Sequence, residues 1–273
     1  RWDKSFASEE RILDIVQQIA GACNRTVNES QPIVDARLKN GDRVHIVLPP
    51  VAVNGPIITI RRFPDEPVTK QKLLELQSIS EEEAEFLKHA VRAGYSILIA
   101  GGTGSGKTTF LNALSEYIPE DERVVVIEDT SELQIRTVPN LVRLETRSAG
   151  LEDCREITVR DLIRASLRMR PSRIIVGEVR GGEAFELLTC LNTGHDGSIS
   201  TCHANSTRDT ISRLETMVLM GMELPLQAIR RQIASGIDLI VYLGRLRDKT
   251  RRILEITEVT GMEGDQIGLN PLF

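Results

Sequence analysis

The sequence is poor in aromatic residues and in paired cysteines, and each deficit narrows the classes of protein to which the chain can belong. Aromatic residues make up 4% of the 273 residues, too few for the stacking platforms of proteins that bind single-stranded nucleic acid. Cysteine occurs four times, and no two cysteines form a C-x-x-C pair. This spacing disfavours a disulfide framework and predicts a reducing, cytoplasmic compartment.

Long apolar runs and an excess of basic residues are also absent from the sequence. No run approaches the roughly 18 apolar residues of a membrane-spanning helix, and no segment has the pattern of a signal peptide. The net charge is −5, so a nucleic-acid partner, which usually requires a basic surface, is not expected. The hydrophobic (41%) and charged (27%) fractions are those of a globular chain, and the length predicts about two domains.

Residues 1–66 predict a small α+β domain. Ser8 is placed to cap a helix over residues 8–22, whose apolar side chains fall on one face. Short strands are expected at residues 33–38, 43–48 and 57–62. Asn40 and the glycine after it predict a hairpin with a type I′ turn between the first two strands. Residues 67–70 are interpreted as a linker.

Residues 71–273 predict a larger α/β domain. Strands are expected at residues 95–100, 123–128, 173–179 and 198–202, and helices at residues 80–94, from 107, from 158, at 182–192 and from 207. This alternation favours a mostly parallel sheet with helices on both faces. Two further strands, at residues 238–243 and 251–259, are expected to pair through a turn at 247–249.

The strongest motif is a glycine-rich loop between a predicted strand and a predicted helix. It consists of Gly101, Gly102, Thr103, Gly104, Ser105, Gly106, Lys107, Thr108 and Thr109, and it matches the P-loop pattern G-x-x-x-x-G-K-[ST]. Backbone N–H groups of such a loop surround phosphate oxygens, and the following helix directs its positive end at the anion. We expect Lys107 to bind the β- and γ-phosphates of ATP and Thr108 to hold Mg²⁺. A glycine-rich turn that binds nothing is the alternative, which the strand–loop–helix context disfavours.

Two predicted strands end in acidic residues. Glu128 ends one of them and Glu178 lies near the end of the other. Ligands of open α/β sheets bind at the carboxyl ends of strands, so both carboxylates are expected near the phosphates. One would contribute to the Mg²⁺ site and one would orient the attacking water, although either could instead pair with an arginine for a structural reason. Gly177 stands where P-loop enzymes often have an aspartate, so contact with the metal is expected to run through water.

Arginine is unevenly distributed along the chain. Residues 136–180 contain ten arginines and no lysine, and arginine is favoured where flat, bidentate contact with phosphate or carboxylate is needed. Arg136 and Arg143 are candidates for contact with the nucleotide, and Arg61 and Arg62 could reach the same site. For most single arginines a surface ion pair is the simpler interpretation. A stripe that faces solvent or another subunit is expected at Arg160, Arg164 and Arg168.

His203 directly follows the predicted strand at residues 198–202 and could hydrogen-bond the γ-phosphate. A zinc site is the alternative, because Cys190, His195 and Cys202 lie nearby in sequence. However, the paired ligand spacing of most zinc sites is missing. In addition, consecutive residues of a strand, such as Cys202 and His203, point to opposite faces.

In their order along the chain, these motifs closely resemble those of the secretion ATPase superfamily of type II secretion, type IV secretion and type IV pili. The segments that carry the resemblance are residues 58–63, 101–109, 126–133, 140–146, 167–181, 193–198 and 203–205. Within the superfamily, RLETMVLM at 213–220 and ITEVTGM at 256–262 resemble the CpaF/TadA-type motors of Tad/Flp pilus assembly.

The resemblance implies a RecA-like ATPase domain behind the smaller α+β domain, which is expected to be truncated upstream. It also implies a homohexameric ring in the cytoplasm, at the inner face of the cell membrane, which hydrolyses ATP with Mg²⁺. Motion of the domains would pass to an inner-membrane platform protein and so drive pilus assembly or secretion. A RecA-like motor that translocates DNA, a small-molecule kinase and a nucleotide-binding scaffold without turnover are the alternatives.

By position, the resemblance also implies roles for individual residues. Lys107 and Thr108 belong to the Walker A motif, Glu128 to the Asp box, Glu178 to Walker B as its glutamate, and His203 to the His box. Thr108 and Glu178 are the expected Mg²⁺ residues. Arginines of the small domain and of the Asp-box region are implied in phosphate binding, and the positions that match are Arg61, Arg62, Arg136 and Arg143.

Overall fold

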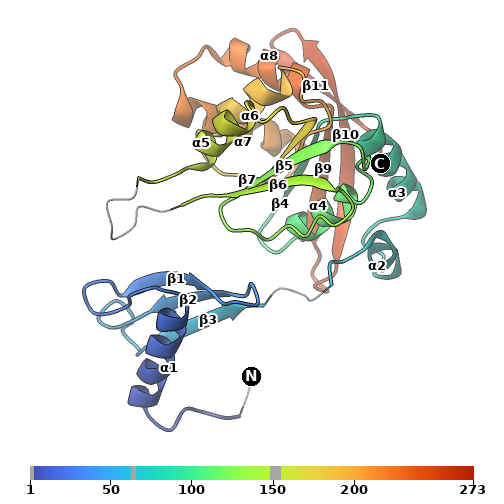
Figure 1. Cartoon of the computed structure of the whole chain (residues 1–273). Coiled ribbons are helices and arrows are strands. Elements are labelled where there is room, and N and C mark those ends of the chain that lie inside the picture. Colours follow the sequence, from blue (N-terminus) through green and yellow to red (C-terminus); the bar gives the residue numbers. More distant parts are fainter. Residues whose placement is uncertain (1–2, 63–65, 148–154) are drawn as a thin grey trace. The chain divides into compact units, whose positions relative to one another are not determined.

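The computed structural model describes residues 3–62, 66–147 and 155–273, and the chain divides into two compact units, residues 1–66 and 67–273 (Figure 1). The last residue of the 58–63 motif and Cys154 lie outside the described residues. Among the described residues, none of the helices is both long enough and apolar enough to cross a membrane.

The smaller unit is a three-stranded antiparallel sheet with a helix on one face. Its elements are α1 (Glu9–Ala22), β1 (Ile33–Arg37), β2 (Arg43–Val47) and β3 (Ile57–Arg61), and the strand order is β1-β2-β3. The Ser8 hydroxyl accepts a hydrogen bond from the backbone N–H of Arg11, which confirms the predicted cap. Val16 of α1 packs in one apolar cluster with Val44 and Ile46 of the sheet, so alternate residues of each strand are left on the opposite face.

The turn between β1 and β2 differs from the predicted type I′ turn. Between Leu38 and Asp42 only Gly41 has a positive φ, 94°, whereas a type I′ turn needs two such residues. The backbone N–H of Leu38 donates to the Asp42 carbonyl, and that of Gly41 donates to the Leu38 carbonyl. The hairpin is therefore closed by a three-residue loop with glycine in the left-handed position.

The larger unit contains an eight-stranded sheet in the order β11-β10-β9-β4-β8-β7-β5-β6. The strands are β4 (Ile97–Gly101), β5 (Arg123–Glu128), β6 (Asn140–Glu145), β7 (Arg173–Val179), β8 (Ile199–Cys202), β9 (Leu239–Arg245), β10 (Arg251–Glu263) and β11 (Gln266–Pro271). The six strands from β9 to β6 are parallel, and β10 and β11 extend the sheet as antiparallel strands. This confirms the α/β fold class and the predicted pairing of β9 with β10.

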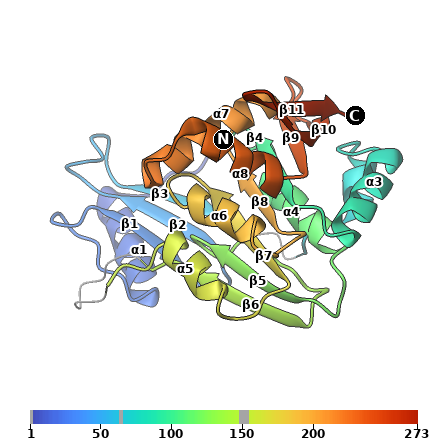
Figure 2. The same ribbon diagram turned by 90° about the horizontal axis from the view of Figure 1, so that it is seen from above.

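Helices cover both faces of this sheet, as predicted (Figures 1 and 2). They are α2 (Lys70–Glu75), α3 (Glu81–Arg92), α4 (Lys107–Ser115), α5 (Val159–Ser166), α6 (Ala184–Leu191), α7 (Thr207–Gly221) and α8 (Leu226–Gly236). Ile97 and Ile99 of β4 face α3 and α4, whereas Leu98 and Ala100 face the layer of α5 to α8. The apolar residues of a central strand are thus divided between two cores, which is why the strand is apolar at every position. Helix α2 begins at Lys70, inside the segment interpreted as a linker.

Candidate functional site

The P-loop lies at the carboxyl end of β4, a strand whose five residues are all buried, and leads directly into α4. Gly104 (φ 73°) and Gly106 (φ 97°) have left-handed backbone conformations that other residues rarely adopt. No side chain caps the N-terminus of α4, so the N–H groups of its first turn are directed into the loop. Among the described residues, the buried Ser105 hydroxyl has no hydrogen-bond partner. This concave set of donors fits a phosphate group.

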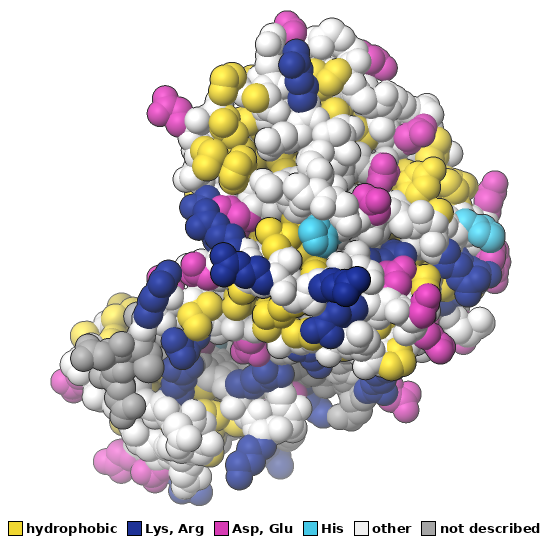
Figure 3. Space-filling view, turned by 45° about the horizontal axis from the view of Figure 1, so that its top comes forward, with side chains coloured by type: hydrophobic (Ala, Val, Ile, Leu, Met, Phe, Trp, Pro, Cys, Tyr) yellow, Lys and Arg dark blue, Asp and Glu magenta, His cyan; other side chains and the backbone are white. Residues whose placement is uncertain are grey.

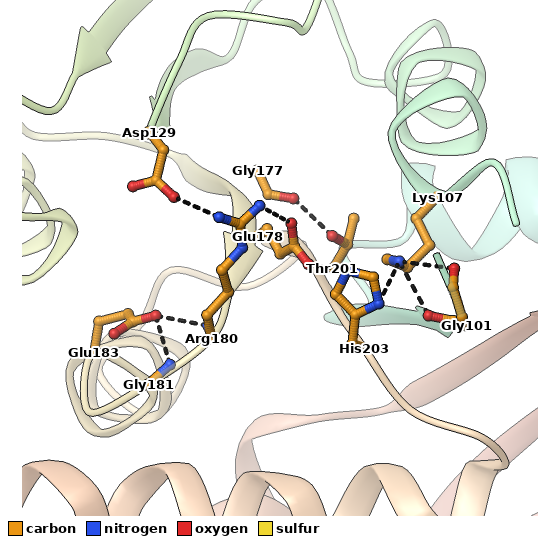
Figure 4. Close-up of polar contacts among 11 residues, drawn as sticks. Gly101, Lys107, Asp129, Gly177, Glu178, Arg180, Gly181, Glu183, Thr201 and His203 are labelled. Carbon is orange, nitrogen blue, oxygen red and sulfur yellow. Dashed lines mark hydrogen bonds and ion pairs between the residues drawn. The ribbon is translucent and has the colours of Figure 1, made fainter. Parts of the chain in front are cut away.

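Lys107 lies within the loop and is only 8% exposed. Its Nζ donates to the carbonyls of Gly101, at 3.0 Å, and Gly102, at 3.3 Å, and lies 3.4 Å from His203 Nδ1 (Figure 4). Burial lowers the pKa of this ammonium from its usual value, with Glu178 acting against the shift. A phosphate in the loop would supply the negative charge that this buried cation needs.

Glu178, His203 and Arg180 continue this line of contacts away from Lys107 (Figure 4). His203 Nε2 lies 2.7 Å from Glu178 Oε1, and Arg180 Nη2 donates to Glu178 Oε2 at 2.6 Å. The other guanidinium nitrogen, Arg180 Nη1, lies 3.4 Å from Asp129 Oδ2. The hydrogen bond to Glu178 raises the pKa of Arg180. The structure thus brings together three predicted residues, Lys107, Glu178 and His203.

His203 lies between a cation and a carboxylate. Burial, and next the charge of Lys107, lower its pKa from the usual value. A neutral imidazole has one donor and one acceptor nitrogen, so Nδ1 is assigned as the acceptor that faces Lys107. The proton then lies on Nε2, which faces Glu178.

A bulge in β7 sets the direction of the Glu178 side chain. The register of β7 with β8 shifts between Val176 and Val179. Hydroxyls of β8 satisfy the carbonyls at this point, because Ser200 Oγ donates to Val176 and Thr201 Oγ1 donates to Gly177. Bulges commonly redirect side chains next to active sites, and this one lies directly before Glu178.

Glu128 lies at the end of β5, which neighbours β7, in different surroundings. It is 6% exposed, and its Oε1 accepts hydrogen bonds from the backbone N–H groups of Glu132, at 2.8 Å, and Leu133, at 2.9 Å. Burial raises its pKa, and these two hydrogen bonds oppose the shift. A Cβ at Gly177 would lie 3.0 Å from Glu128 Cγ. Glycine in place of the usual aspartate therefore leaves room for the Glu128 side chain.

Arg143 and Arg136 lie near the segment that follows Glu128. Arg143 Nη2 donates to Ser131 Oγ and the Leu133 carbonyl, and lies 3.9 Å from Glu128 Oε2. Arg136 is exposed and donates to the Gln134 side chain at 3.1 Å. Both arginines contact protein groups of this loop, so a role at the nucleotide stays a prediction.

The prediction that the arginines of α5 face solvent or another subunit is wrong for Arg160, and it describes Arg164 only in part. Arg160 Nε donates to Glu186 Oε2 at 2.9 Å, and Arg164 Nη2 donates to Glu186 Oε1 at 2.8 Å. Glu186, on α6, is only 6% exposed. A buried carboxylate needs such partners, so these arginines join α5 to α6.

The residues of the alternative zinc site do not form one cluster. Cys190, on α6, and Cys202, on β8, are buried in the apolar cluster between the sheet and α5 to α8, and burial raises the pKa of each thiol to about 12. His195 Nδ1 lies 3.2 Å from the Cys190 carbonyl, and His203 belongs to the Lys107 contacts. In the described part of the chain, no group of three or more His, Cys, Asp or Glu residues is arranged for a metal ion.

The small unit carries three arginines in one row across its sheet. Arg37 of β1 pairs with Arg43 of β2, and Arg43 pairs with Arg61 of β3. All three lie on the face opposite α1, by the strand alternation described above. The hairpin register therefore places three guanidinium side chains in one row on this face. Sequence reasoning found Arg61 and Arg62 but missed Arg37 and Arg43, because only the hairpin register places them beside Arg61.

Two other arginines near the P-loop were also missed. Arg251, at the start of β10, donates from Nε to the Gly104 carbonyl at 2.8 Å. Arg180 was counted among the arginines of its region but was not singled out, although its position two residues after Glu178 is a usable signal. Arg251 is 147 residues from Gly104, and nothing local in the sequence indicates this contact.

A P-loop at the carboxyl edge of a parallel sheet, with a buried lysine beside a glutamate and a histidine, defines the class: a RecA-like P-loop ATPase. The family described as "Type II/IV secretion system protein" matches residues 3–264, and the chain belongs to this family.

Individual relatives agree with this assignment. The chain is 38% identical over 265 residues to a putative conjugal transfer protein of Mycobacterium tuberculosis, with 95% of this chain and 75% of that protein covered. It is 35% identical over 262 residues to the type IV secretion system protein VirB11 of Brucella suis, with 86% and 72% covered. The crystal structure of the Brucella suis VirB11 ATPase, in complex with sulphate, superposes with a TM-score of 0.59 at 31% identity, covering 92% of this chain and 83% of that one.

Proposed function

We propose that the chain is the ATP-hydrolysing subunit of a homohexameric motor that drives pilus assembly or secretion of the Tad/Flp type. It would work in the cytoplasm, at the inner face of the membrane, and pass domain motion to an inner-membrane platform protein. Family membership supports a secretion ATPase. The single observation that carries the chemistry is the line of contacts from Lys107 through His203 and Glu178 to Arg180.

The P-loop would bind the triphosphate of ATP. The left-handed glycines and the uncapped start of α4 supply N–H donors, and Ser105 supplies a buried hydroxyl with no other partner among the described residues. Lys107 would exchange its contacts with loop carbonyls for contacts with the β- and γ-phosphates. Thr108 would hold Mg²⁺, Glu178 would reach it only through water, and Mg²⁺ when bound neutralises charge on the phosphates.

Glu178 would act as the base that orients the attacking water and accepts its proton. Arg180 Nη2 donates a hydrogen bond to one carboxylate oxygen, and His203 Nε2 lies 2.7 Å from the other. The neutral His203 would donate from Nε2. As the reaction proceeds, this N–H could exchange its acceptor, Glu178, for a γ-phosphate oxygen. Glu128 would support this site through the loop at residues 129–133 rather than exchange a proton itself.

The arginine row of the small unit would bind phosphate oxygens of the nucleotide. The motif resemblance implies phosphate binding by arginines in the region of Arg61, and Arg37 and Arg43 lie beside Arg61 in register. Arg62 lies directly after the end of β3, outside the paired register, so Arg61 is the stronger candidate of the two. Arg136 and Arg143 would act near the end of β5, from the same or a neighbouring subunit.

The test of this proposal is turnover by the purified chain and its variants. Wild-type protein should release phosphate from Mg-ATP, whereas Lys107→Ala should lose measurable turnover. Arg43→Ala should raise KM or lower kcat, and Arg25→Ala, at an exposed arginine outside the row, serves as its matched control. Electron microscopy with a non-hydrolysable ATP analogue should show six-membered rings. Release of phosphate at the wild-type rate by Lys107→Ala would contradict the assignment.

A DNA-translocating motor is separated from this proposal by one further measurement. Both basic and acidic side chains are present on the face seen in Figure 3, and the chain as a whole carries a net charge of −5. We therefore expect no stimulation of ATP hydrolysis by DNA. Stimulation that falls steeply with salt would favour the DNA motor instead.

A further inference from the structure

A tight backbone crossing lies beside the turn that follows Glu178. Gly182, in the turn between β7 and α6, packs against Gly221, the last residue of α7. A Cβ at Gly221 would lie 2.4 Å from the Gly182 carbonyl oxygen, and a Cβ at Gly182 would lie 2.6 Å from Gly221 Cα. Neither glycine has a positive φ, so the contact itself, and not the backbone conformation, requires glycine at both positions.

Arg160 of α5 bridges this crossing. Its Nη2 donates to the carbonyls of Gly182, at 3.0 Å, and Gly221, at 3.3 Å, while its Nε donates to Glu186 Oε2 at 2.9 Å. A guanidinium presents five N–H donors in fixed directions, so one side chain can serve three acceptors on three elements. We call these four residues, Arg160, Gly182, Glu186 and Gly221, the Arg160 clip.

The clip is joined to the candidate active site by a short, fixed stretch of main chain. Glu183 Oε1 accepts hydrogen bonds from the backbone N–H groups of Arg180, at 2.7 Å, and Gly181, at 2.9 Å (Figure 4). The path from Arg180 to Glu183 is therefore held by Glu183 and, at Gly182, by the clip. The Arg180 side chain reaches Glu178 from this path, so a shift of the turn would move its guanidinium.

We propose that Arg160 is a positioning residue for ATP hydrolysis. By holding Gly182 against Gly221, it fixes the turn that presents Arg180 to Glu178. The clip also contacts the last residue of α7, so it joins the turn after β7 to a second helix of the same layer. This inference rests on the proposed roles of Glu178 and Arg180.

Arg160→Lys tests the clip without removing the positive charge beside Glu186. Lysine has a single nitrogen, so it cannot replace both Nε and Nη2 of the arginine at the carboxylate and the two carbonyls. We expect kcat to fall by ~10- to 100-fold, the loss typical of a catalytic group displaced by about 1 Å. The Kd of a fluorescent N-methylanthraniloyl ATP analogue should change less than ~3-fold, because the P-loop is untouched. Gly221→Ala breaks the same contact with the arginine present and should give the same separation of kcat from Kd.

The matched control is Arg230→Lys. Arg230 also bridges a glutamate and a carbonyl, Glu215 Oε1 and the Asp265 oxygen, each at 2.7 Å, but it lies on α8 rather than at the β7 turn. It should lower the melting temperature about as much as Arg160→Lys and leave kcat near wild type. The double variant of Arg160→Lys and Gly221→Ala should lose no more activity than either single variant, because both break one contact.

Wild-type kcat in Arg160→Lys and Gly221→Ala would overturn the proposal, as would an equal loss in Arg230→Lys. Should Arg160→Lys not fold, Gly221→Ala alone decides by the same two measurements. Glu178→Gln separates this inference from the proposed function. If that variant is inactive while the clip variants are fully active, only the clip is wrong; if Glu178→Gln is active, the catalytic assignment itself fails.

Discussion

The neighbouring strands β5 and β7 both carry a glutamate at the carboxyl end, yet the two side chains have opposite surroundings. Glu128 on β5 is 6% exposed, and one of its oxygens accepts two backbone N–H groups. The Glu178 side chain on β7 is 19% exposed, and its oxygens lie against His203 and Arg180. One glutamate is built into a loop, and the other belongs to a set of charged and titratable side chains.

This difference distinguishes a structural role for Glu128 from a role in proton exchange for Glu178. A group that exchanges a proton with water needs access to water and an oxygen that is not already bound by the main chain. The Glu178 side chain is partly exposed, and its two oxygens lie against the side chains of His203 and Arg180 rather than against main-chain N–H groups. Glu128 is buried and orders the segment that follows it. The comparison thus supports Glu178 as the base, a choice that the motifs alone left open.

The largest expected effect comes from Glu178→Gln. Glutamine keeps the shape of the side chain and can still accept a hydrogen bond from Arg180, but it cannot take a proton. We expect kcat to fall by about 10²- to 10⁴-fold with ATP affinity retained, measured by phosphate release and by binding of the fluorescent ATP analogue. Glu120→Gln, at an exposed glutamate between α4 and β5, is the matched control. Turnover at the wild-type rate would move the catalytic role to Glu128.

Glu128 should give a smaller effect on turnover and a larger one on stability. Glu128→Ala leaves two N–H groups, of Glu132 and Leu133, without their acceptor and should cost ~1–3 kcal/mol of unfolding free energy. Glu128→Gln keeps an acceptor oxygen, so it should retain most of the stability and more activity than Glu178→Gln. Urea denaturation and kcat measured on both variants check this. A loss in Glu128→Gln equal to that of Glu178→Gln, at unchanged stability, would show a chemical role for Glu128.

Gly177→Ala would disturb the contact between the two strand ends. The new Cβ would lie 3.0 Å from Glu128 Cγ, closer than an ordinary contact, so the glutamate must shift. Overpacking of this kind costs ~1–3 kcal/mol, and we expect the low end because a single methyl group is added. The melting temperature and the denaturation midpoint measure the effect. An unchanged midpoint would mean that Glu128 does not need the room that glycine leaves.

The smallest effect is a pair of pH dependences with opposite sign. Burial raises the pKa of Glu128, so the stability linked to it is present at low pH and is lost as pH rises above ~4.3 through the native pKa. Burial lowers the pKa of His203, so its contribution is present above ~6.5 and is lost as pH falls toward the native pKa. The melting temperature is measured from pH 4 to pH 8 for each variant. Glu128→Gln should flatten only the first pH dependence, and His203→Gln only the second. Flattening of the same slope by both variants would contradict the comparison.

Local signals in the sequence predicted the starts of α1 and of α3 to α7 and the position of the glycine-rich loop, whereas α2 and α8 were not predicted. The capping boxes of α3, Ser80 with Glu83, and of α5, Thr158 with Asp161, are both present in the structure. Each involves residues three positions apart, so no distant part of the chain is needed to form it. The same holds for the P-loop, whose donors come from consecutive residues.

Elements that depend on their neighbours were missed. Strand β6 is an edge strand with no fully buried residue, so it lacks the apolar run or clean alternation that predicts a strand, and it is defined by its pairing with β5. Strand β11 likewise depends on β10. Arg160 was predicted on a stripe facing solvent or another subunit, because its partner Glu186 lies 26 residues away on another helix and no local signal indicates the contact.

The sequence by itself determined the glycine-rich loop and the fold that surrounds it, because the loop motif and the alternation of strands and helices are properties of short segments. Only the tertiary structure decided the surroundings of the other candidate site residues. The strand order set Glu128 beside Gly177, a bulge set Glu178 beside His203, and the hairpin register set Arg43 beside Arg61. Such contacts join residues far apart in the chain, and burial and hydrogen bonding at the contact, rather than residue type, separate a catalytic carboxylate from a structural one.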